Sequence, residues 1–486
     1  MCAFYEKWRL DVDFYGREEL LIDLDSLWGK NSPSLVTCRG RRRIGKSTLI
    51  ARFAELSNAR FIKIEGERPD VGMNNEDELA TFAGQLSLYA GEDIPVAKNW
   101  LKAFKSLDDV LDDRRTVVLL DEVSWLANFD KRFAATLKIA WDNMFKNHRQ
   151  LVFVVCGSVS TWIKEKIVDS KAYYGRRSLD IVVPELALKD CVRFWSGRSD
   201  RVSVRDILDI LSITGGVPRY LEEVNPSQSV DDNIRRMAFR PDSTLRKDFD
   251  EMFRDVITRR PRMVATLLEA LVDGPMTMSE ISGAISAGVG GNVSAALNQL
   301  VESGLVARDI GINPETGDEI RERRYRLSDN YVRFYLKCIR PAAKTIDAGA
   351  FRYSRLARFN EWNAVKGFAF ENLIVNHYGE LLPYLHLGES HVYSAAPYRK
   401  NGPKGKRLQI DLLLQTRRSQ CVVEIKRKNT IGRGIIDEVA EKIKRLKRAP
   451  DSSVRAALVY DGELAETVLA DGYFDAIIPF RRLLGL

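Results

Sequence analysis

The stretch SLVTCRGRRRIGKS, residues 34–47, decides the fold of the first third of the chain. Its apolar start, Leu35 to Cys38, is typical of a buried strand, and the residues that follow, STLIARFAEL, have the spacing of an amphipathic helix. The loop between them matches the pattern GxxxxGK[ST]. Because a glycine-rich turn between a strand and a helix lets backbone N–H groups wrap phosphates, the stretch predicts a P-loop that binds ATP.

The loop residues have separate predicted roles. Lys46 is expected to reach the β- and γ-phosphate oxygens, and the Ser47 hydroxyl is expected to bind Mg²⁺. The residues predicted to contact the nucleotide are Gly40, Arg41, Arg42, Arg43, Ile44, Gly45, Lys46, Ser47 and Thr48.

A second apolar run, Val117 to Leu120, ends in the two carboxylates Asp121 and Glu122. Asp121 is predicted to hold the Mg²⁺ ion indirectly, as the acidic residue of the second nucleotide motif does. Glu122 is predicted to be catalytic, orienting or deprotonating the attacking water. Alternatively, Asp121 and Glu122 could simply be the first residues of a surface loop. The presence of the P-loop motif with Lys46 in the same chain disfavours this alternative.

Three more residues are candidates for the nucleotide site. Ser158 follows an apolar strand, where it can sense the γ-phosphate or cap a helix. Arg176 precedes the last strand and is predicted to be an arginine finger, with a surface ion pair as the alternative. Arg219 follows a Gly-Gly-Val-Pro break and is expected to point back at the nucleotide. The remaining strands of a parallel α/β sheet are predicted at ARFIKIEG (59–66), QLVFVVCGSVS (150–160) and SLDIVVPEL (178–186).

Taken together, these motifs resemble the archaeal-type ATPase family, a branch of the signal-transduction ATPases related to origin-recognition ATPases. The resemblance implies an ATPase with an additional catalytic glutamate, a parallel five-stranded sheet in the order 5-1-4-3-2, and a helical lid. By the same resemblance Ser158 is the sensor position, and Gly215, Gly216 and Pro218 form the GxP turn. The segments that carry it are FYGREEL (14–20), RGRRRIGKST (39–48), VVLLDEVSWL (117–126), VVCGSVSTWI (154–163), YYGRR (173–177) and TGGVPRYLEE (214–223).

Length and composition limit the class of protein. A chain of 486 residues is too long for one core and should form three or four domains. No run of 18 apolar residues is present, and the first residues lack the apolar centre of a signal peptide, so we expect no membrane partner. The six scattered cysteines and four histidines form no metal-ligand spacing, which favours a reducing, cytoplasmic location.

The middle of the chain predicts a winged helix-turn-helix. Three helical patterns between 261 and 303 precede a hairpin around the turn Asn313–Gly317. The would-be recognition helix, 290–303, contains no Lys or Arg, whereas the wing contains four arginines. Because phosphate contacts depend on basic side chains, weak non-specific DNA contact and a packing module remain alternatives.

The last third carries a second constellation. Between Arg399 and Arg448 there are sixteen Lys or Arg residues against five Asp or Glu residues, an excess that favours a polyanionic partner. The strands LQIDLLLQ and CVVEIKRK place Asp411, Glu424 and Lys426 in the spacing D-x₁₂-E-x-K. Glu424 and Lys426 are two residues apart, so they share one strand face.

The element order around these residues, from an amphipathic helix with Glu371 to a final strand VRAALVY (454–460), looks like the PD-(D/E)xK, or restriction-endonuclease-like, fold. Asp411 and Glu424 are predicted ligands of Mg²⁺ or Mn²⁺, and Lys426 is predicted to stabilise the transition state of phosphodiester hydrolysis. Glu371 is predicted to add a ligand for a second ion. The alternative is a salt-bridged, degenerate nuclease fold that still binds nucleic acid.

We therefore expect an α/β multidomain protein in which ATP controls a nuclease acting on nucleic acid, with DNA the favoured substrate. The alternative is a non-cleaving regulatory ATPase that binds DNA or a protein partner. A homo-oligomer is compatible with both, since an arginine finger can act on a neighbouring subunit. The expected domains are a P-loop ATPase core (1–186), a helical lid (187–258), a winged helix-turn-helix (259–340) and a nuclease-like domain (347–486).

Overall fold

The structure is a computed structural model that describes residues 14–158, 160–195, 201–256, 261–285, 290–351, 361–387, 392–401 and 407–486. The chain divides into two compact units, Met1–Glu185 and Leu186–Leu486. Cys2, Gly288 and residues 402–406 of the basic loop lie outside the described residues. In the described ranges no helix is both long and apolar enough to cross a membrane.

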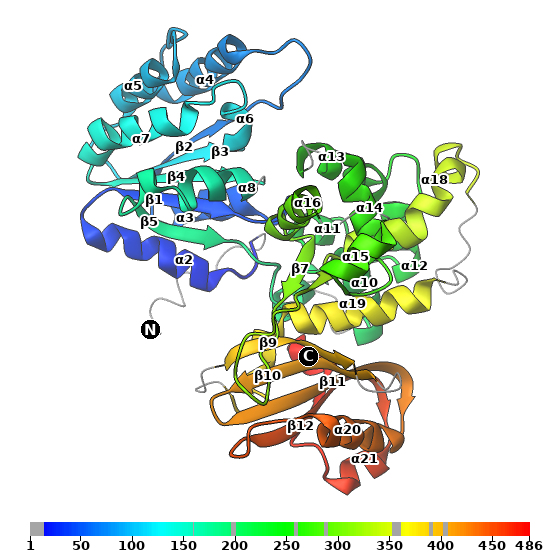
Figure 1. The fold of residues 1–486 in the computed structure, drawn as a ribbon. Coiled ribbons are helices and arrows are strands. Elements are labelled where there is room, and N and C mark those ends of the chain that lie inside the picture. The colour runs from blue at the N-terminus through cyan, green and yellow to red at the C-terminus, as the bar shows by residue number, and fades with distance from the viewer. Residues whose placement is uncertain are drawn as a thin grey trace. The chain divides into compact units, whose positions relative to one another are not determined.

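The first unit contains one parallel sheet. Its strands are β1 (Ser34–Arg39), β2 (Arg60–Glu65), β3 (Thr116–Asp121), β4 (Leu151–Gly157) and β5 (Arg177–Val182). They lie in the order β2-β3-β4-β1-β5, which is the predicted 5-1-4-3-2 order read from the other edge (Figure 1). Every residue of β3 and β4 is buried. This explains why both read as continuous apolar runs, since helices cover the two faces of a parallel sheet.

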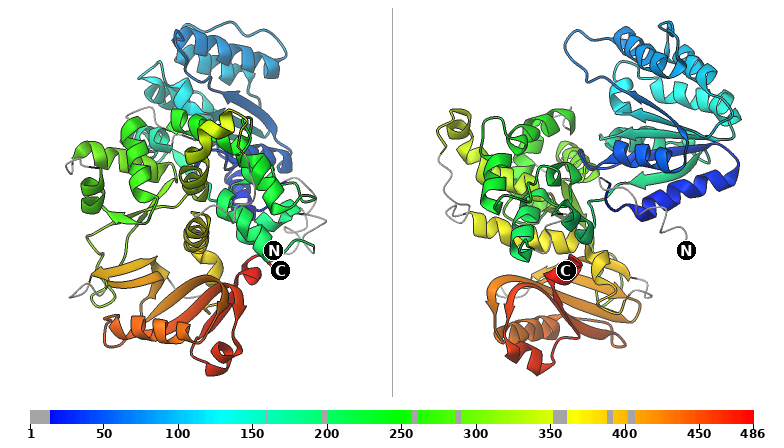
Figure 2. Two further views of the ribbon diagram at one scale, coloured as in Figure 1. Left: turned by 90° about the vertical axis from the view of Figure 1, so that its right-hand side faces the viewer. Right: turned by 180° about the vertical axis from the view of Figure 1, so that it is seen from behind.

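Helices pack on both faces of this sheet (Figures 1 and 2). The helices α2 (Glu18–Asp25) and α3 (Lys46–Leu56) cover one face. The helices α4 (Asn75–Ala90), α5 (Trp100–Val110) and α7 (Phe133–Asn143) cover the other. The short helices α6 (Val123–Leu126) and α8 (Ser160–Ile163) follow the carboxyl ends of β3 and β4.

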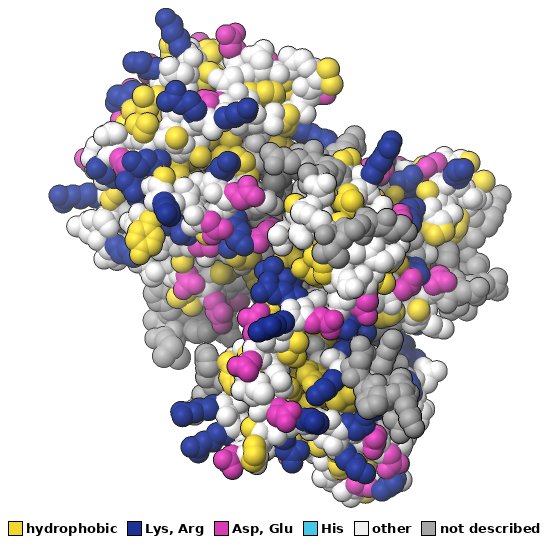
Figure 3. Space-filling model, viewed as in Figure 1, with side chains coloured by type: hydrophobic (Ala, Val, Ile, Leu, Met, Phe, Trp, Pro, Cys, Tyr) yellow, Lys and Arg dark blue, Asp and Glu magenta, His cyan; other side chains and the backbone are white. Residues whose placement is uncertain are grey.

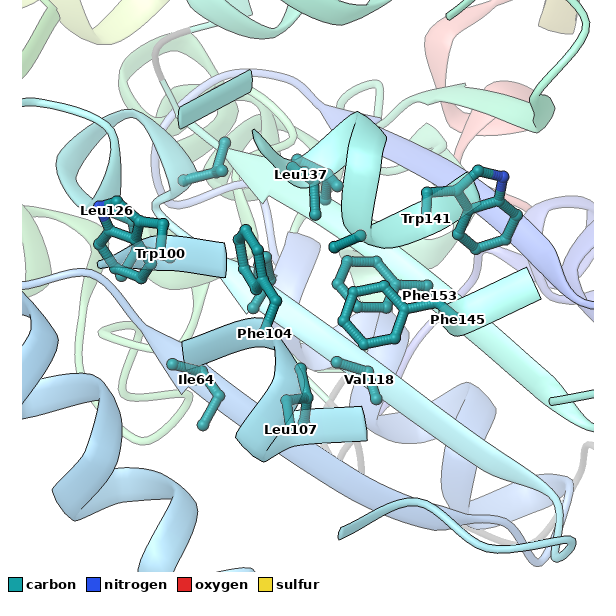
Figure 4. Close-up of a cluster of buried hydrophobic side chains, with 14 of the residues drawn as sticks. Ile64, Trp100, Phe104, Leu107, Val118, Leu126, Leu137, Trp141, Phe145 and Phe153 are labelled. Atoms are coloured by element: carbon teal, nitrogen blue, oxygen red, sulfur yellow. The ribbon is translucent and has the colours of Figure 1, made fainter. Parts of the chain in front are cut away.

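An aromatic cluster attaches the α4–α5–α7 layer to the sheet (Figure 4). In α5 the buried residues Trp100, Ala103, Phe104 and Leu107 follow the spacing of one helix face. Phe104 is fully buried, and its ring lies edge-on to neighbouring rings, including that of Phe145. Edge-on ring pairs add stabilisation beyond the burial of apolar area, so this cluster fixes the helical layer in position.

The second unit begins with a helical region. Its helices are α9 (Leu188–Cys191), α10 (Val204–Thr214), α11 (Pro218–Leu221), α12 (Val230–Ala238) and α13 (Thr244–Val256). Three helices and a small antiparallel sheet in the order β6-β8-β7 follow. These are α14 (Pro261–Leu271), β6 (Met276–Thr277), α15 (Met278–Ala284), α16 (Gly291–Glu302), β7 (Val306–Asp309) and β8 (Arg324–Leu327). Whether this part acts as a winged helix stays a prediction.

The C-terminal part of the second unit is a five-stranded sheet in the order β13-β12-β11-β10-β9 (Figures 1 and 2). The strands are β9 (Val392–Asn401), β10 (Arg407–Thr416), β11 (Ser419–Ile431), β12 (Ser453–Leu464) and β13 (Ala476–Pro479). The helices are α17 (Asn330–Phe334), α18 (Arg340–Asp347), α19 (Trp362–Asn376), α20 (Gly434–Arg445), α21 (Glu466–Asp471) and α22 (Phe480–Leu483).

The strand pairing in this sheet is mixed. β9, β10 and β11 pair antiparallel, whereas β11, β12 and β13 pair parallel. The stretch VRAALVY lies in β12, but it is not the final strand, because β13 follows it. The strand β13 has only four residues and alternates weakly between buried and half-buried positions, so its sequence gives little signal.

One buried carboxyl in the first unit gives a stability prediction. Glu78 of α4 is fully buried, and its Oε1 accepts a hydrogen bond from the Glu67 N–H at 2.9 Å. Burial raises the pKa of Glu78 from 4.5 to about 7. The folded protein therefore holds this proton up to higher pH than the unfolded chain, so its stability falls as pH rises from about 4.5 to about 7.

We expect Glu78→Gln to remove this loss, because the amide cannot ionise. The variant should be more stable than the wild type by about 1–3 kcal/mol at pH 8 and of similar stability at pH 4.5. Thermal unfolding across this pH range measures the difference. Glu76→Gln, at an exposed carboxyl of the same helix, is the matched control, and an equal pH response in the two variants would contradict the assignment.

Candidate nucleotide site and C-terminal carboxylate site

The P-loop connects β1 to α3 through two glycines with positive φ. Gly40 has a φ of +149°, and a Cβ built there would lie 2.8 Å from the carbonyl oxygen of Val183. Gly45 has a φ of +86° and occupies the N-cap position of α3. Both positions therefore require glycine, one for its close approach to a neighbouring backbone and both for their left-handed conformation.

The Lys46 side chain is buried within this loop. Its Nζ donates hydrogen bonds to the carbonyl oxygens of Gly40 and Arg41, each at 3.2 Å. The ammonium group is thus held by the backbone of the loop that is predicted to bind phosphate. This placement gives the loop a fixed positive charge beside the N-terminus of a helix, which favours anions.

Ser47 and Asp121 lie next to each other although 74 residues separate them in sequence. The Ser47 Oγ donates to Asp121 Oδ2 at 2.5 Å. A hydroxyl and a carboxylate are the hard oxygen donors that Mg²⁺ prefers, so these two residues fit the ion predicted for this position. Thr48, the next residue, continues the first turn of α3.

A lysine that the sequence interpretation did not select also contacts this carboxylate. Lys63, on β2, lies 3.3 Å from Asp121 Oδ2 and 2.6 Å from Glu65 Oε2. Burial acts to lower the pKa of Lys63, but the two carboxylates outweigh it and raise the pKa. The signal was a lysine within the apolar run of ARFIKIEG, which breaks the pattern of a strand buried on both faces.

Glu122 and Ser158, predicted separately, are in direct contact. Glu122 has a left-handed backbone conformation with a φ of +46°, and it precedes the short helix α6. Its Oε2 accepts hydrogen bonds from the Ser158 Oγ at 2.9 Å and from the Ser158 N–H at 3.2 Å. Ser158 is almost fully buried. The structure therefore brings the predicted catalytic carboxylate and the predicted sensor together at the ends of β3 and β4.

The two arginines predicted to approach the nucleotide have other partners. The Arg176 guanidinium forms two hydrogen bonds to Asp142 of α7, at 2.7 and 3.0 Å. This is the ion pair that the sequence left open as an alternative. Arg219 belongs to the second unit, where it pairs with Glu222 at 3.1 Å and Glu223 at 3.2 Å.

In the C-terminal sheet, Asp411 lies at an irregularity between β10 and β9. The register of these strands shifts by one residue between Ile410 and Leu413, opposite Pro397. Proline has no N–H to donate, so the ladder breaks there and β10 gains an extra residue. The Asp411 Oδ2 instead accepts a hydrogen bond from the Ile425 N–H at 3.0 Å. The bulge thus turns the Asp411 carboxylate toward β11.

Glu424, on β11, is fully buried and held by two lysines. Its Oε1 lies 2.7 Å from Lys426 Nζ, and its Oε2 lies 2.5 Å from Lys442 Nζ of α20. Both lysines also contact Glu438, at 3.0 and 3.3 Å. The paired register of β10 and β11 begins at Leu412 and Val423, so Asp411 and Glu424 are the adjoining residues of the two strands. Asp411, Glu424 and Lys426 therefore lie near one another, and Lys442 joins them.

The charges of this group affect one another. Burial raises the pKa of Asp411, and the carboxylate of Glu371 raises it further. Burial and the Asp411 charge likewise raise the pKa of Glu424, against the two lysines. Burial raises the pKa of Glu371 as well, although nearby arginines oppose the shift. The Asp411 carboxylate thus lies between two others, Glu371 and Glu424, with which it interacts unfavourably when all are ionised.

The described residues contain no group of three or more His, Cys, Asp or Glu side chains arranged to hold a metal ion. Asp411 and Glu424 supply hard oxygen donors that suit Mg²⁺, but each oxygen of Glu424 already faces an ammonium group. Lys442 could not be singled out from sequence, because it is one of several basic residues in KIKRLKR.

The fold and the Lys46, Ser47 and Asp121 geometry define the first unit as a P-loop ATPase domain. A protein-family model described as an ATPase domain predominantly from Archaea matches residues 14–224. Residues 14–224 are therefore similar in sequence to ATPase domains of this archaeal type.

Relatives cover more of the chain at low identity. The uncharacterized protein MJECL04 of Methanocaldococcus jannaschii is 24% identical over 364 residues, which are 74% of this chain and 76% of that protein. The Walker-type ATPase paby2304 of Pyrococcus abyssi has 16% identity and a TM-score of 0.48, over 67% of this chain and 96% of that one. The ORC2 protein of Aeropyrum pernix has 14% identity and a TM-score of 0.42, over 69% of this chain and 95% of that one.

The close approach of Gly40 to Val183 predicts that the loop cannot accept a side chain there. We expect Gly40→Ala to lower ATP affinity by at least about tenfold, because an added Cβ meets backbone that cannot yield. Calorimetric titration with ATP measures the loss. Gly84→Ala, in α4 with no atom within 4 Å of the added carbon, is the control and should bind ATP as the wild type does. Unchanged affinity in Gly40→Ala would refute the assignment of this loop.

Proposed function

We propose that the protein is an ATP-hydrolysing switch that controls a metal-dependent nuclease site in its C-terminal sheet, with DNA as the favoured substrate. The observation that carries the nuclease assignment is the meeting of Asp411, Glu424 and Lys426 on adjacent strands. The ATPase part is supported by the family match and by the contacts of Lys46, Ser47 and Asp121.

At the nucleotide site each residue has a role that follows from its contacts. Lys46 leaves the loop carbonyl groups and donates to phosphate oxygens. Glu122 accepts a proton from, or orients, the attacking water. Ser158 donates two hydrogen bonds to the Glu122 carboxylate and so orients it.

At the C-terminal site the bulge fixes Asp411, and Lys426 and Lys442 hold Glu424. A bound Mg²⁺ or Mn²⁺ ion would supply charge neutralisation and a water of lowered pKa. The Lys426 ammonium, on the face of β11 that bears Glu424, stabilises negative charge developing on the phosphate. Glu371 contributes charge from α19, close enough to raise the pKa of Asp411.

The middle of the second unit relays the state of the protein rather than reading sequence. The helix α16 carries no basic residue. In the predicted wing, Arg326 is buried, pairs with Asp309 at 3.1 Å and donates to Asn372 of α19 at 2.5 Å. A buried guanidinium with these partners is unavailable for DNA phosphates. These contacts favour the packing module over DNA recognition by this winged helix.

A second candidate is a regulatory ATPase that does not cleave. The pairing of both Glu424 oxygens with lysines favours it, because ammonium groups neutralise the carboxylate without a metal. In this case the C-terminal sheet is a degenerate nuclease fold that binds nucleic acid or a protein.

A cleavage assay separates the two functions. It uses single-stranded, linear, supercoiled and branched DNA plus RNA, with Mg²⁺ or Mn²⁺, in the presence and absence of ATP. Under the nuclease proposal, Lys426→Ala lowers cleavage by at least about 100-fold and leaves ATP turnover within about twofold. Lys428→Ala, an exposed lysine of the same strand, is the matched control. Lys46→Ala shows whether ATP licenses or inhibits cleavage. No cleavage by a wild type that still hydrolyses ATP would favour the regulatory ATPase.

Metal binding gives an independent test of the C-terminal site. Titration of Mn²⁺ into full-length Lys46→Ala protein without nucleotide should show a binding heat that adding Asp411→Asn removes. Glu441→Gln, at an exposed carboxyl of α20, serves as the control and should keep that heat. Equal heats in the Asp411 and Glu441 variants would place the ion elsewhere and weaken the nuclease proposal.

A further inference from the structure

The second unit contains a pocket of about 320 Å³ beside the C-terminal carboxylates. One wall comes from Pro275 and Met276, before α15, and from Arg324 of β8. The other wall comes from Arg399 and Lys400 of β9 and from Gln409 of β10. The pocket thus joins the small three-stranded sheet to the C-terminal sheet within one compact unit.

The acidic groups at this pocket already have partners. Glu280 accepts the Thr277 N–H at 2.7 Å and pairs with Arg324 at 3.1 Å, as the N-terminal cap of α15. Asp273 pairs with Lys337 at 2.6 Å. These two carboxylates therefore pair with Arg324 and Lys337 and, in the part of the chain that the structure describes, form no ion pair with the other cations of the pocket.

Arg399 and Lys400 are those cations. Among the described residues neither forms an ion pair, and the buried Nε of Arg399 has no hydrogen-bond partner. Burial lowers the pKa of Arg399, although the charges of Glu371 and Asp411 oppose this shift. A half-buried guanidinium with an unused donor is costly unless an anion joins it. The pocket therefore selects for a negatively charged ligand.

The pocket residue Arg399 lies close enough to the carboxylate site for the charges of Glu371 and Asp411 to act on its pKa. Arg399 pairs across the ladder with Gln409, and Asp411 follows two residues later. The bulge between Ile410 and Leu413 interrupts the regular strand spacing at this point, and it turns Asp411 toward β11. An anion at Arg399 would thus lie near the group at Asp411.

The exposed charges do not suggest a broader basic surface. On the face drawn in Figure 3, Lys and Arg side chains over the C-terminal sheet and α20 are interspersed with Asp and Glu side chains. A mixed surface of this kind attracts polyanions weakly. We therefore assign the recognition of a polyanion to the pocket, which Arg399 and Lys400 line.

We propose that this pocket binds a backbone phosphate of single-stranded nucleic acid and delivers the neighbouring phosphodiester to Asp411 and Glu424. Arg399 and Lys400 bind the phosphate, and Pro275 and Met276 contact the sugar or base. A volume near the lower limit for ligand pockets admits about one nucleotide rather than a duplex. This inference rests on the proposed nucleic-acid function and names the substrate form of that site.

The test measures binding without cleavage. Fluorescence anisotropy of a labelled single-stranded oligonucleotide is followed in EDTA over a series of salt concentrations, with full-length protein. Arg399→Ala should raise the Kd about tenfold and reduce the magnitude of the salt slope by ~0.7, the value for one phosphate contact on a single strand. Lys400→Ala, at an exposed position, should weaken binding in the same direction without disturbing the fold.

Arg417→Ala is the matched control, because this exposed arginine lies on the turn at the opposite end of β10. It should bind like the wild type. Wild-type affinity in both the Arg399 and Lys400 variants, or equal loss in the Arg417 variant, would overturn the proposal. Displacement of the oligonucleotide by a mononucleotide at equal phosphate concentration would also overturn it, since the pocket would then hold a small ligand.

The outcomes for this pocket and for the nuclease are distinguishable. Binding that depends on Arg399 in a wild type that cuts nothing would support the pocket and reject the nuclease. Cleavage lost in Lys426→Ala but unchanged in Arg399→Ala, with unchanged binding, would support the nuclease and reject the pocket.

Discussion

A buried charge needs a counter-charge or a hydrogen-bond partner, and both candidate sites are built on this constraint. In the first unit, Lys46 is held by loop carbonyl groups, Asp121 by Ser47 and Lys63, and Glu122 by Ser158. In the C-terminal sheet, Glu424 is held between two lysines. Each of these charges therefore has a partner within the protein that offsets the cost of its burial.

The first unit was largely predictable because its function depends on sequence-local geometry. A P-loop consists of a strand, a glycine-rich turn and a helix in immediate succession. The sequence pattern of residues 34–56 indicates all three. The strands β1, β3 and β4 are buried on both faces and therefore read as continuous apolar runs, whereas the edge strands β2 and β5 are partly exposed. The residues at the carboxyl ends of β3 and β4 had to meet, because parallel strands end at one edge of the sheet. Glu122 and Ser158 do so.

The missing parts of the sites come from residues whose partners are distant in sequence. Lys442 contacts Glu424 only because α20 packs on β11, and nothing local distinguishes it from Lys444. The bulge at Asp411 could be predicted only if Pro397 of β9 were known to lie opposite it. That pairing is set by the register of the two strands, which the sequence does not reveal. For Arg176 the local motif suggested a catalytic role. In the structure its guanidinium instead forms an ion pair with Asp142 of α7. In all three cases the role of the residue depends on a contact with a segment that is distant in sequence, and no local pattern identifies that contact.

Hydrogen bonds and an ion pair join the first helices of the second unit to its C-terminal part. The residue after Lys426 is Arg427, whose guanidinium contacts Asp209 at 2.5 Å and Ser212 at 3.1 Å, both on α10. At the start of the unit, the Leu188 N–H donates to Glu380 at 3.1 Å, and the Leu186 carbonyl oxygen lies 3.0 Å from His377 Nε2. The chain that leaves the ATPase sheet is thus bonded to the segment after α19, and α10 is bonded to the strand of Lys426. A displacement of these first helices would therefore act on β11 and on the segment after α19 through these bonds.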